Sequence, residues 1–339
     1  MWGMPLPLIP ESHPATGADP GRKLRLLEVV RRRARERRYS RRTEEAYVNW
    51  IRRFVRFHGR RHPKDMGETE VRDFLSSLAV ERGVSASTQN QALAALRFLY
   101  DAVLARPLSR ADDFTPAPRR EREPTVLSEH EVRVLLARLS RVPRLCAELM
   151  YGSGLRVSEC LALRVKDVDL DRLEIVVRGG KGDRDRRTPL AARSVEVLRQ
   201  HLARELARYE RDRRRDIRTT NIGVALSRKY PNAEREWRWR YVFASVRTVV
   251  DDAGVRRRHH IDASLLQRAI PEAARSAELS KRVTCHALRH SFATHLLESG
   301  TDVSTVQKLL GHEHLETTSR YLHPNNRGRL TVRSPADRL

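Results

Sequence analysis

The sequence contains little cysteine, and its three thiols are not spaced for a metal site. Cys146, Cys160 and Cys285 are odd in number and form no CxxC pair. This pattern argues against a zinc ribbon and a disulfide-stapled secreted domain, and it indicates a reducing compartment. No apolar run approaches the length of a membrane span, and no charged-then-apolar leader precedes a cleavage site. We therefore expect a soluble, cytoplasmic protein without a membrane partner.

Acidic residues are scarce relative to basic ones. The chain of 339 residues has 67 Lys and Arg against 43 Asp and Glu, which gives a formal net charge of +24. A single arginine run is usually a solvated helix face, but this excess is spread along the whole chain. Such a distribution indicates a polyanion contacted over a wide surface, and we expect nucleic acid.

Proline and glycine are concentrated in a few places, and these divide the chain. Residues 1–20 are rich in both and are expected to be disordered. Four prolines fall between residues 106 and 124, among mixed charges and few apolar residues, which is typical of a linker. The length allows two domains with separate cores. We predict an N-terminal domain over 21–106, a linker over 107–124, a second domain over 125–330 and a tail over 331–339.

Helical periodicity dominates the N-terminal domain. A helix is predicted over 22–38, and apolar residues recur at helical spacing in three further segments that begin at residue 40 or 43, after residue 69, and after residue 85 or 87. The first segment, 22–38, is so basic that its exposed face would repel itself unless a polyanion lay beside it. Trp50 and Phe54 lie on the apolar face of the second segment and are expected in the core, not on a base-stacking surface. The pattern predicts a small all-α domain.

The second domain mixes helices with one predicted β-hairpin. A capping box of the form S-x-x-E opens it at Ser128. Alternation over 173–177 and a returning segment over 187–190 predict two strands, joined by a Gly-Gly-Lys-Gly-Asp turn. Lys181 would lie at the tip of this hairpin. The whole chain is therefore predicted to be mainly α with a small antiparallel β-sheet, and this domain to be α+β.

Residues 285–323, CHALRHSFATHLLESGTDVSTVQKLLGHEHLETTSRYLH, carry polar residues where a helical core would need apolar ones. His286 and Arg289 are three apart and share one helix face. His312 directly follows a helix predicted to end at Gly311, and Tyr321 lies in the next segment. Histidine, arginine and tyrosine at helix edges indicate a site that handles phosphate, with a metal cluster as the rival interpretation.

Several simpler interpretations compete with a phosphate site. His290 and His295 are five apart, not four, and no HExxH motif occurs, which argues against zinc. The GGKG turn lacks the GxxxxGK[ST] spacing of a phosphate-binding P-loop. Taken singly, Arg156 is an ordinary surface residue beside Glu159, and Lys181 is an ordinary hairpin lysine. We predict no metal and no cofactor.

The order of these motifs resembles the tyrosine recombinase (phage integrase) family. SGLRVSE, a turn lysine 25 residues after its arginine, HALRH, LGH and a terminal tyrosine follow one another. The resemblance covers about residues 22–330 and implies an N-terminal helical-bundle (SAM-like) core-binding domain and an α+β catalytic domain. The family pattern of Arg, Lys, HxxR, His or Trp, and Tyr falls on Arg156, Lys181, His286, Arg289, His312 and Tyr321.

The resemblance also implies how these residues act. Tyr321 would attack the phosphodiester with His286 as its base and leave a 3′-phosphotyrosine, while Lys181 would protonate the leaving 5′-oxygen. Two arginines would clamp the non-bridging oxygens and His312 would hydrogen-bond the phosphate. The energy of the bond is kept in the phosphotyrosine, so neither ATP nor a metal is required. Four protomers would act on two DNA sites.

A segment over 225–279 resembles the insert that distinguishes integron integrases, which holds extrahelical bases of a folded single-stranded site. It contains ALSRKYPNAEREWRWRYVFAS, RRRHHID and LLQRAI. The alternative is a strand with its aromatic residues inward. The subfamily usually has Pro after the Phe of this insert, whereas Ala244 follows Phe243 here. Flat rings and cations suit flipped bases, so the predicted DNA contacts are Trp237, Trp239, Arg240, His259 and His260.

The sequence thus predicts an integron-type site-specific DNA recombinase that inserts and excises gene cassettes. Its partners would be a duplex site and a folded single-stranded hairpin site, bound by a homotetramer on synapsed DNA. The alternatives are a generic phage or Xer-type recombinase, a type IB topoisomerase that nicks and reseals, and a non-catalytic DNA-binding protein on the same scaffold.

Overall fold

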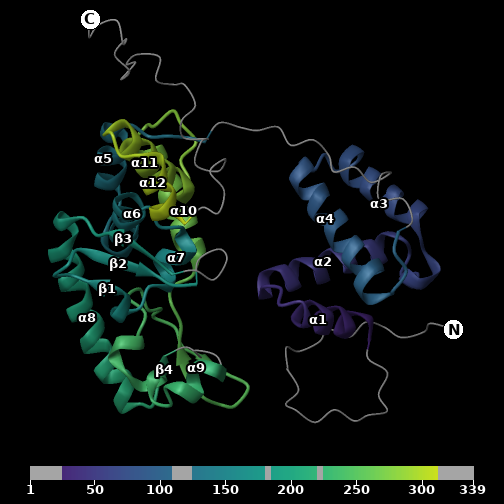
Figure 1. Cartoon of the computed structure of the whole chain (residues 1–339), viewed down its shortest axis with the longest axis horizontal. Helices are drawn as coiled ribbons and strands as arrows, with labels where there is room; N and C mark the ends of the chain where they lie inside the picture. The colour runs from purple at the N-terminus through teal and green to yellow at the C-terminus, as the bar shows by residue number, and fades with distance from the viewer. Residues whose placement is uncertain (1–24, 109–123, 180–184, 220–223, 312–339) are drawn as a thin grey trace, which may run out of the picture. The chain divides into compact units, whose positions relative to one another are not determined.

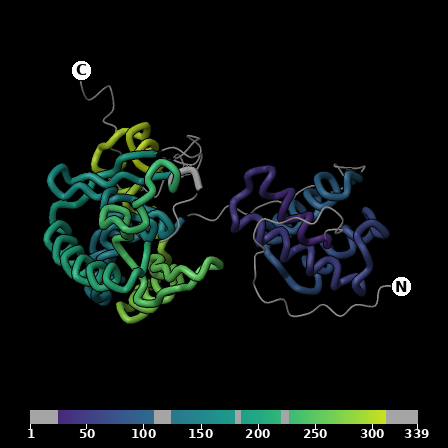
Figure 2. Tube along the Cα trace, turned by 90° about the horizontal axis from the view of Figure 1, so that it is seen from below, coloured from purple at the N-terminus to yellow at the C-terminus, as the bar shows by residue number. Residues whose placement is uncertain are grey.

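The computed structural model describes residues 25–108, 124–179, 185–219 and 224–311. These residues form two compact units, one within 13–122 and the other made mostly of 123–339 (Figure 1, Figure 2). The predicted N-terminal disorder, most of the linker and the C-terminal tail lie outside the described residues. So do Lys181, His312 and Tyr321. None of the described helices is long and apolar enough to cross a membrane.

Four α-helices form the N-terminal unit, as predicted. They are α1 (Leu26–Glu36), α2 (Arg41–Phe57), α3 (Glu68–Val80) and α4 (Ala86–Phe98). The side chain of Ser40 caps α2 by accepting a hydrogen bond from the Thr43 amide at 3.1 Å. After α4 the chain continues through a π-helical turn, η2 (Leu99–Val103). Each helix contributes its apolar face to one shared core.

The aromatic residues of this unit lie in its core. Phe54 is fully buried and packs edge-on against Phe74 at 5.6 Å between ring centroids. Trp50 is also buried, and its indole N–H donates to Gln91 at 3.0 Å. These contacts confirm the assignment of Trp50 and Phe54 to the core.

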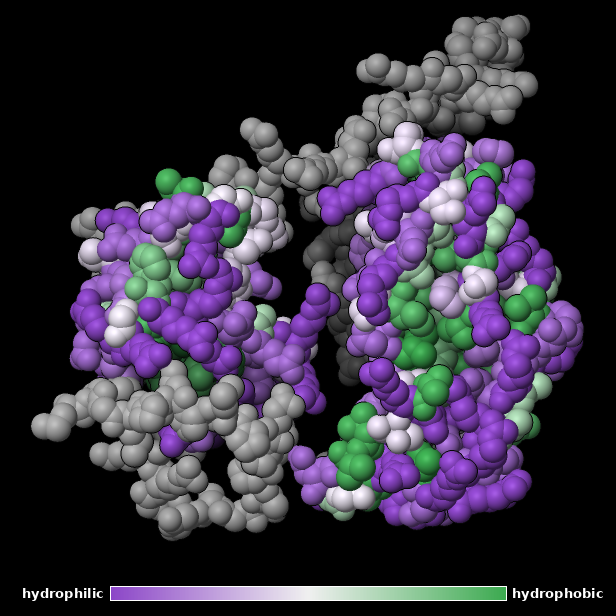
Figure 3. Space-filling model, turned by 180° about the vertical axis from the view of Figure 1, so that it is seen from behind, coloured by the Kyte–Doolittle hydropathy of each residue, from purple (hydrophilic) through white to green (hydrophobic). Residues whose placement is uncertain are grey.

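Ion pairs within the unit relieve part of the repulsion expected for the basic helix α1. The buried carboxylate of Glu44 on α2 accepts from Arg35 at 3.0 Å and 3.1 Å and lies 3.8 Å from Arg31. Glu36 accepts from Arg33 at 2.9 Å. A bound polyanion is therefore not needed for α1 to form. The visible faces of both units are nevertheless covered mainly by hydrophilic side chains (Figure 3).

Eight α-helices are described in the second unit: α5 (Glu129–Arg138), α6 (Arg141–Ser153), α7 (Val157–Ala162), α8 (Val195–Arg214), α9 (Val224–Lys229), α10 (Ala263–Ser276), α11 (Cys285–Glu298) and α12 (Val303–Leu310). The predicted capping box at Ser128 opens α5. Helices α5, α6, α7, α10 and α11 share one apolar core. All three cysteines are buried there as free thiols.

The predicted hairpin is present as part of a three-stranded antiparallel sheet. Its strands are β1 (Val168–Asp169), β2 (Glu174–Val177) and β3 (Arg186–Pro189), in the order β1-β2-β3. Pairing between β2 and β3 ends at Val177 opposite Arg186, so the Gly-rich turn begins where expected. The mainly α fold with a small antiparallel sheet is therefore confirmed.

A second sheet, which the periodicity did not predict, joins the insert to the residues just before it. It consists of β4 (Arg218–Thr219), β6 (Arg256–Arg258) and β5 (Val249–Val250), with β4 and β6 parallel. Three consecutive arginines form β6, and a strand so rich in charge does not show apolar alternation. The WRW sequence is a 3-10 turn, η7 (Trp237–Trp239), so its interpretation as a strand was wrong.

Candidate active site

A sharp turn between α6 and α7 brings Arg156 to the site. Helix α6 ends at Gly154, whose φ of 62° lies in the left-handed region. A Cβ at this position would lie 2.5 Å from the ring of Phe292 on α11, so only glycine allows the close approach. Two residues later Arg156 is the N-cap of α7, and its amide donates to Glu159 at 2.8 Å. The SGLRVSE motif therefore encodes a tight turn against α11.

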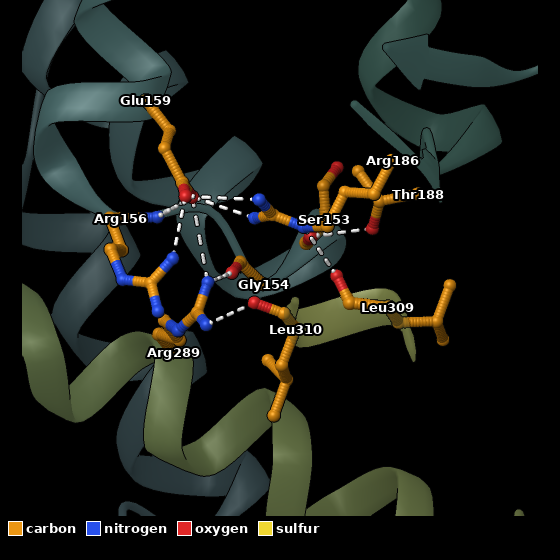
Figure 4. Close-up of polar contacts among 9 residues, drawn as sticks. All are labelled: Ser153, Gly154, Arg156, Glu159, Arg186, Thr188, Arg289, Leu309 and Leu310. Atoms are coloured by element: carbon orange, nitrogen blue, oxygen red, sulfur yellow. Dashed lines mark hydrogen bonds and ion pairs between the residues drawn. The ribbon is translucent and has the colours of Figure 1, made fainter. Parts of the chain in front are cut away.

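Arg289 links this turn to helix α12. Its side chain is only 4% exposed and donates to the carbonyl oxygens of Gly154 and Leu310, each at 2.6 Å (Figure 4). His286 lies one turn earlier on α11. The predicted placement of His286 and Arg289 on one helix is thus confirmed. Arg289 connects α11 to the turn at Gly154 and to the end of α12.

Glu159 lies at the centre of an arginine cluster (Figure 4). It accepts from Arg156 at 2.7 Å and from Arg186 at 2.7 Å and 3.0 Å, and its Oε2 lies 3.5 Å from Arg289. Three guanidinium groups surround one carboxylate, so the cluster carries an excess of two positive charges. An arginine fork matches the oxygens of a phosphate, and this excess favours an anion.

Sequence reasoning missed Arg186. This residue opens β3, and its side chain is 8% exposed. Besides Glu159 it donates to the Leu309 carbonyl at 2.8 Å, at the end of α12. Thr188, two residues on and therefore on the same face of the strand, is buried and donates to Ser153 at 2.6 Å. Because Arg186 lies two residues before the buried Thr188, it shares the buried face of the strand. That spacing was the signal that would have identified Arg186.

The carboxylate of Glu159 stays ionised despite its surroundings. Burial by itself would raise its pKa, but hydrogen bonds from Arg186 and the Arg156 amide, with the charges of Arg186 and Arg289, lower the pKa to about 2. The cluster therefore keeps the same charge throughout the physiological range.

The pKa of His286 is shifted so that the ring is neutral near pH 7. Partial burial lowers it from 6.5, and the charges of Arg289 and Arg156 act in the same direction. The ring of His290 packs edge-on to it at 5.8 Å between centroids. Burial, followed by the charges of His286 and Arg289, lowers the pKa of His290 to about 4. A neutral imidazole at the surface beside two arginines can accept a proton.

His295, the third histidine of α11, forms a contact between helices. Nδ1 of His295 lies 2.9 Å from the hydroxyl of Tyr151 on α6, a contact between helices. Among the described residues, no group of three or more His, Cys, Asp or Glu side chains is arranged to hold a metal ion.

Comparison with known proteins assigns this arrangement to a family. Residues 125–327 match the phage integrase family, and residues 26–110 match its N-terminal SAM-like domain. The chain belongs to the phage integrase family. It is a tyrosine-type site-specific DNA recombinase, and the predictions of family, fold and enzyme class are confirmed.

Relatives of this recombinase cover most of its length. An "Integrase/recombinase" of Escherichia coli is 47% identical over 322 residues, which are 94% of this chain and 95% of that protein. The "Tyrosine recombinase XerA" of Thermococcus onnurineus is 32% identical over 282 residues, 79% of this chain and 83% of that one. A lambda integrase dimer bound to a core site has the same fold, with a TM-score of 0.60 at 16% identity over 91% of this chain and 98% of that chain.

Three residues of the family pattern lie outside the described part of the recombinase. They are Lys181, His312 and Tyr321. Gly311, the described residue just before His312, lies close to the arginine cluster: its φ is 64°, and a Cβ there would lie 3.1 Å from Arg186. The resemblance-based roles of these three residues stay predictions.

The structure separates the five predicted base contacts of the insert. His259 is exposed, and Trp237 and His260 are half-buried. Trp239 is 5% exposed and Arg240 is 1% exposed, so in this structure neither is displayed on the surface for direct contact with DNA. The 3-10 turn η7 explains why the two tryptophans of WRWR differ in burial: unlike a strand, it does not place alternate residues on the same face.

The two buried residues of the insert support its fold. Nζ of Lys166 lies 3.0 Å from the centroid of the Trp239 ring, a cation–π contact. The Arg240 guanidinium lies 2.7 Å from the carboxylate of Asp212 on α8. In this structure Trp239 and Arg240 pack the insert against the rest of the catalytic domain, and their role in binding bases stays a prediction.

Proposed function

We propose that this recombinase is an integron-type integrase that inserts and excises gene cassettes, acting on duplex and folded single-stranded DNA sites. It acts in the cytoplasm as a homotetramer on two synapsed sites. The observation that carries the proposal is the folded insert between α8 and α10, which has its own sheet and displays Arg256 and His259 at its surface. A recombinase that handled only regular duplex would not need this additional surface.

In the proposed reaction the arginine cluster binds the scissile phosphate. Arg156 is the most accessible of the three arginines, with 25% of its side chain exposed. Glu159 orients it, and the charge excess stabilises the non-bridging oxygens as negative charge grows on them in the transition state. Arg289 and Arg186 keep the cluster assembled through their contacts with the end of α12.

The covalent step transfers the phosphoryl group from DNA to the protein. The hydroxyl oxygen of Tyr321 forms a bond to phosphorus and the bond to the 5′-oxygen breaks. His286 takes the proton of the tyrosine and Lys181 gives a proton to the leaving oxygen, while His312 hydrogen-bonds the phosphate. Attack by the 5′-hydroxyl of another strand reverses these transfers and completes recombination.

The insert supplies the proposed contacts with extrahelical bases. His259 and His260 extend from β6, next to Arg256, which is exposed. Trp237 packs at 5.4 Å against Tyr209 of α8 and remains half-buried, so part of its ring is available for stacking. Stacking on an aromatic ring contributes about 1–3 kcal/mol per base.

A Xer-type recombinase acting on duplex sites is the second candidate function. The burial of Trp239 and Arg240 favours it, because it removes two of the predicted base contacts. A XerH recombinase bound to its difH site shares the fold at a TM-score of 0.57 and 21% identity. In that case the insert would only stabilise the position of α8.

The enzymatic chemistry is tested with a suicide duplex, nicked so that the cleaved fragment diffuses away. The wild-type chain should accumulate a covalent protein–DNA adduct and Tyr321→Phe should form none. An adduct formed by Tyr321→Phe would contradict the nucleophile assignment, and its absence in both proteins would contradict the reaction.

The choice between the two substrates is tested by binding to a folded hairpin with bulged bases and to the same sequence as duplex. Trp237→Ala should weaken hairpin binding about tenfold, the loss of one stacked base, and leave duplex binding unchanged. Leu206→Ala, an exposed apolar change on α8, is the control and should alter neither. Equal affinity of the wild-type chain for hairpin and duplex would favour the Xer-type function.

A further inference from the structure

Asp185 joins the two ends of the turn between β2 and β3. Beyond the last strand pair, the amide of Gly179 donates to Oδ1 of Asp185 at 3.1 Å. The guanidinium of Arg178 donates to Oδ2 of the same carboxylate at 3.1 Å. Residues 180–184 of the turn therefore lie between two positions, Gly179 and Asp185, that are hydrogen-bonded to each other.

Arg178 also bonds this turn to the body of the domain. Its Nε donates to Oδ1 of Asp167 at 2.6 Å. Asp167 is 4% exposed and ends a 3-10 turn, η4 (Val165–Asp167), where Oδ2 accepts from the Arg164 amide at 3.1 Å. We call Asp167, Arg178, Gly179 and Asp185 the hairpin clamp.

The other strand of the hairpin is attached to the arginine cluster. Arg186 directly follows Asp185 and bonds to Glu159 and to the Leu309 carbonyl. Both strands are thus fixed at the base of the turn, β3 by the phosphate-binding cluster and β2 by Asp167.

Stability alone does not account for the pair formed by Arg178 and Asp185. The side chains of Arg178 and Asp185 are 50% and 51% exposed. Ion pairs with this exposure contribute about 0–1 kcal/mol, and ordering the long arginine side chain costs a similar amount. The effect that remains is geometric: a guanidinium that bridges two carboxylates limits where the turn can lie.

We propose that the hairpin clamp is a positioning device for the turn lysine. Asp167 and Asp185 act through Arg178 to hold the turn where the ammonium of Lys181 reaches the leaving 5′-oxygen. The proposal rests on the function proposed above for Lys181. In this proposal the clamp residues act through the turn and not on the reacting atoms, so they are positioning residues.

The test compares two duplex suicide substrates that differ in one atom. The first has the natural 5′-oxygen at the scissile phosphate, and the second has a 5′-bridging sulfur. A thiolate leaves without being protonated, so cleavage of the sulfur substrate does not need a general acid. The ratio of the two adduct-forming rates therefore reports on proton donation and not on phosphate binding or folding.

A variant that has lost its proton donor should cleave the 5′-oxygen substrate slowly and the 5′-sulfur substrate at a normal rate. Lys181→Met should reduce cleavage of the oxygen substrate at least about 100-fold and leave cleavage of the sulfur substrate near the wild-type rate. Asp167→Asn and Asp185→Asn should reduce cleavage of the oxygen substrate about tenfold, with the same rescue, because the donor is present but misplaced. Asp185→Asn changes an exposed side chain and is expected to fold normally.

Glu174→Gln is the matched control. Glu174 accepts from Arg187 at 2.6 Å in the same hairpin, but it pairs with Pro189 at the end far from the turn. It should leave both rates unchanged.

Two outcomes overturn the clamp proposal in distinguishable ways. If Lys181→Met is rescued by sulfur and the two clamp variants are equally slow on both substrates, the clamp only supports the fold. If Lys181→Met is not rescued, the lysine is not the proton donor and the proposed function of the turn fails with it.

Discussion

The recombinase contains two acids surrounded by arginines, and they differ in exposure and charge. At the active site, Glu159 contacts three arginines, of which Arg156 has 25% of its side chain exposed. Where the insert meets α8, Asp212 contacts Arg240 and Arg258, whose side chains are 1% and 8% exposed. One cluster has a cation at the surface, and the other encloses its charges.

The hydrogen bonds of the enclosed cluster explain its role. Arg258 donates twice to Asp212 at 2.6 Å and also to the carbonyl oxygens of Ser245 and Val246 at 2.7 Å and 2.5 Å. These bonds join α8, β6 and the loop before β5, so the cluster fixes the insert to the domain. We therefore expect an arginine of this basic chain to bind an anion only where positive charge exceeds the nearby acidic groups and the guanidinium reaches solvent.

The largest expected effect is a loss of DNA cleavage when the Glu159 cluster, and not the Asp212 cluster, is changed. Arg156→Gln should reduce adduct formation on the duplex suicide substrate about 1,000-fold, because it removes a phosphate contact that strengthens in the transition state. Its unfolding midpoint in urea should change little, since the side chain is partly exposed. A variant that cleaves DNA normally would show that the accessible cation does not bind the phosphate.

A second change should affect stability and spare chemistry. Arg258→Met should lower the free energy of unfolding by about 3 kcal/mol, because it leaves the buried Asp212 carboxylate with one partner fewer. Urea unfolding followed by tryptophan fluorescence measures this, since Trp237 and Trp239 lie in the insert. The folded variant should still form the adduct with duplex DNA. Unchanged stability would mean that the Asp212 cluster does not hold the insert.

The smallest expected effect concerns pH, where the two acids should behave alike. Hydrogen bonds and charges from arginines depress the pKa of Glu159 to about 2 and lower that of Asp212 from 3.8, in both cases against the effect of burial. The stability each contributes is present above its unfolded pKa and is lost only as pH falls toward the folded value. Neither cluster should titrate between about pH 5 and 8.

The acidic limb of the pH–rate profile should instead report His286. Its pKa is lowered from 6.5, so the neutral, proton-accepting form persists below that pH. Initial rates of adduct formation should therefore fall with a midpoint below 6.5 and not above it. His286→Ala should be slower and should lose this limb. A limb that is unchanged in His286→Ala would assign the titration to another group.

Much of the catalytic domain was predictable because its signals are local. The capping box at Ser128, the αL glycines at 154 and 311 and the alternation of the β2–β3 hairpin each depend on a few neighbouring residues. The HxxR spacing likewise places His286 and Arg289 on one helix face whatever the rest of the chain does. Motif order then joined residues that are more than a hundred positions apart.

The insert was less predictable because its residues have unusual partners. Arginines that become buried look the same in sequence as arginines that contact DNA, and only the position of Asp212 on α8 distinguishes them. The same applies to Arg186, which periodicity assigned to no role. Trp239 was predicted as a base contact. In the structure its ring makes a cation–π contact with Lys166, which is more than seventy residues away in the sequence.

The sequence by itself determined the family, the helical composition and the residues on which the family pattern falls, because spacing and motif order carry that information. Only the tertiary structure decided which cations are neutralised inside the protein and which reach its surface. The physical reason is that the free energy of a charge depends on its burial and on its neighbours within a few ångströms. Those neighbours come from distant parts of the chain, which no local pattern records.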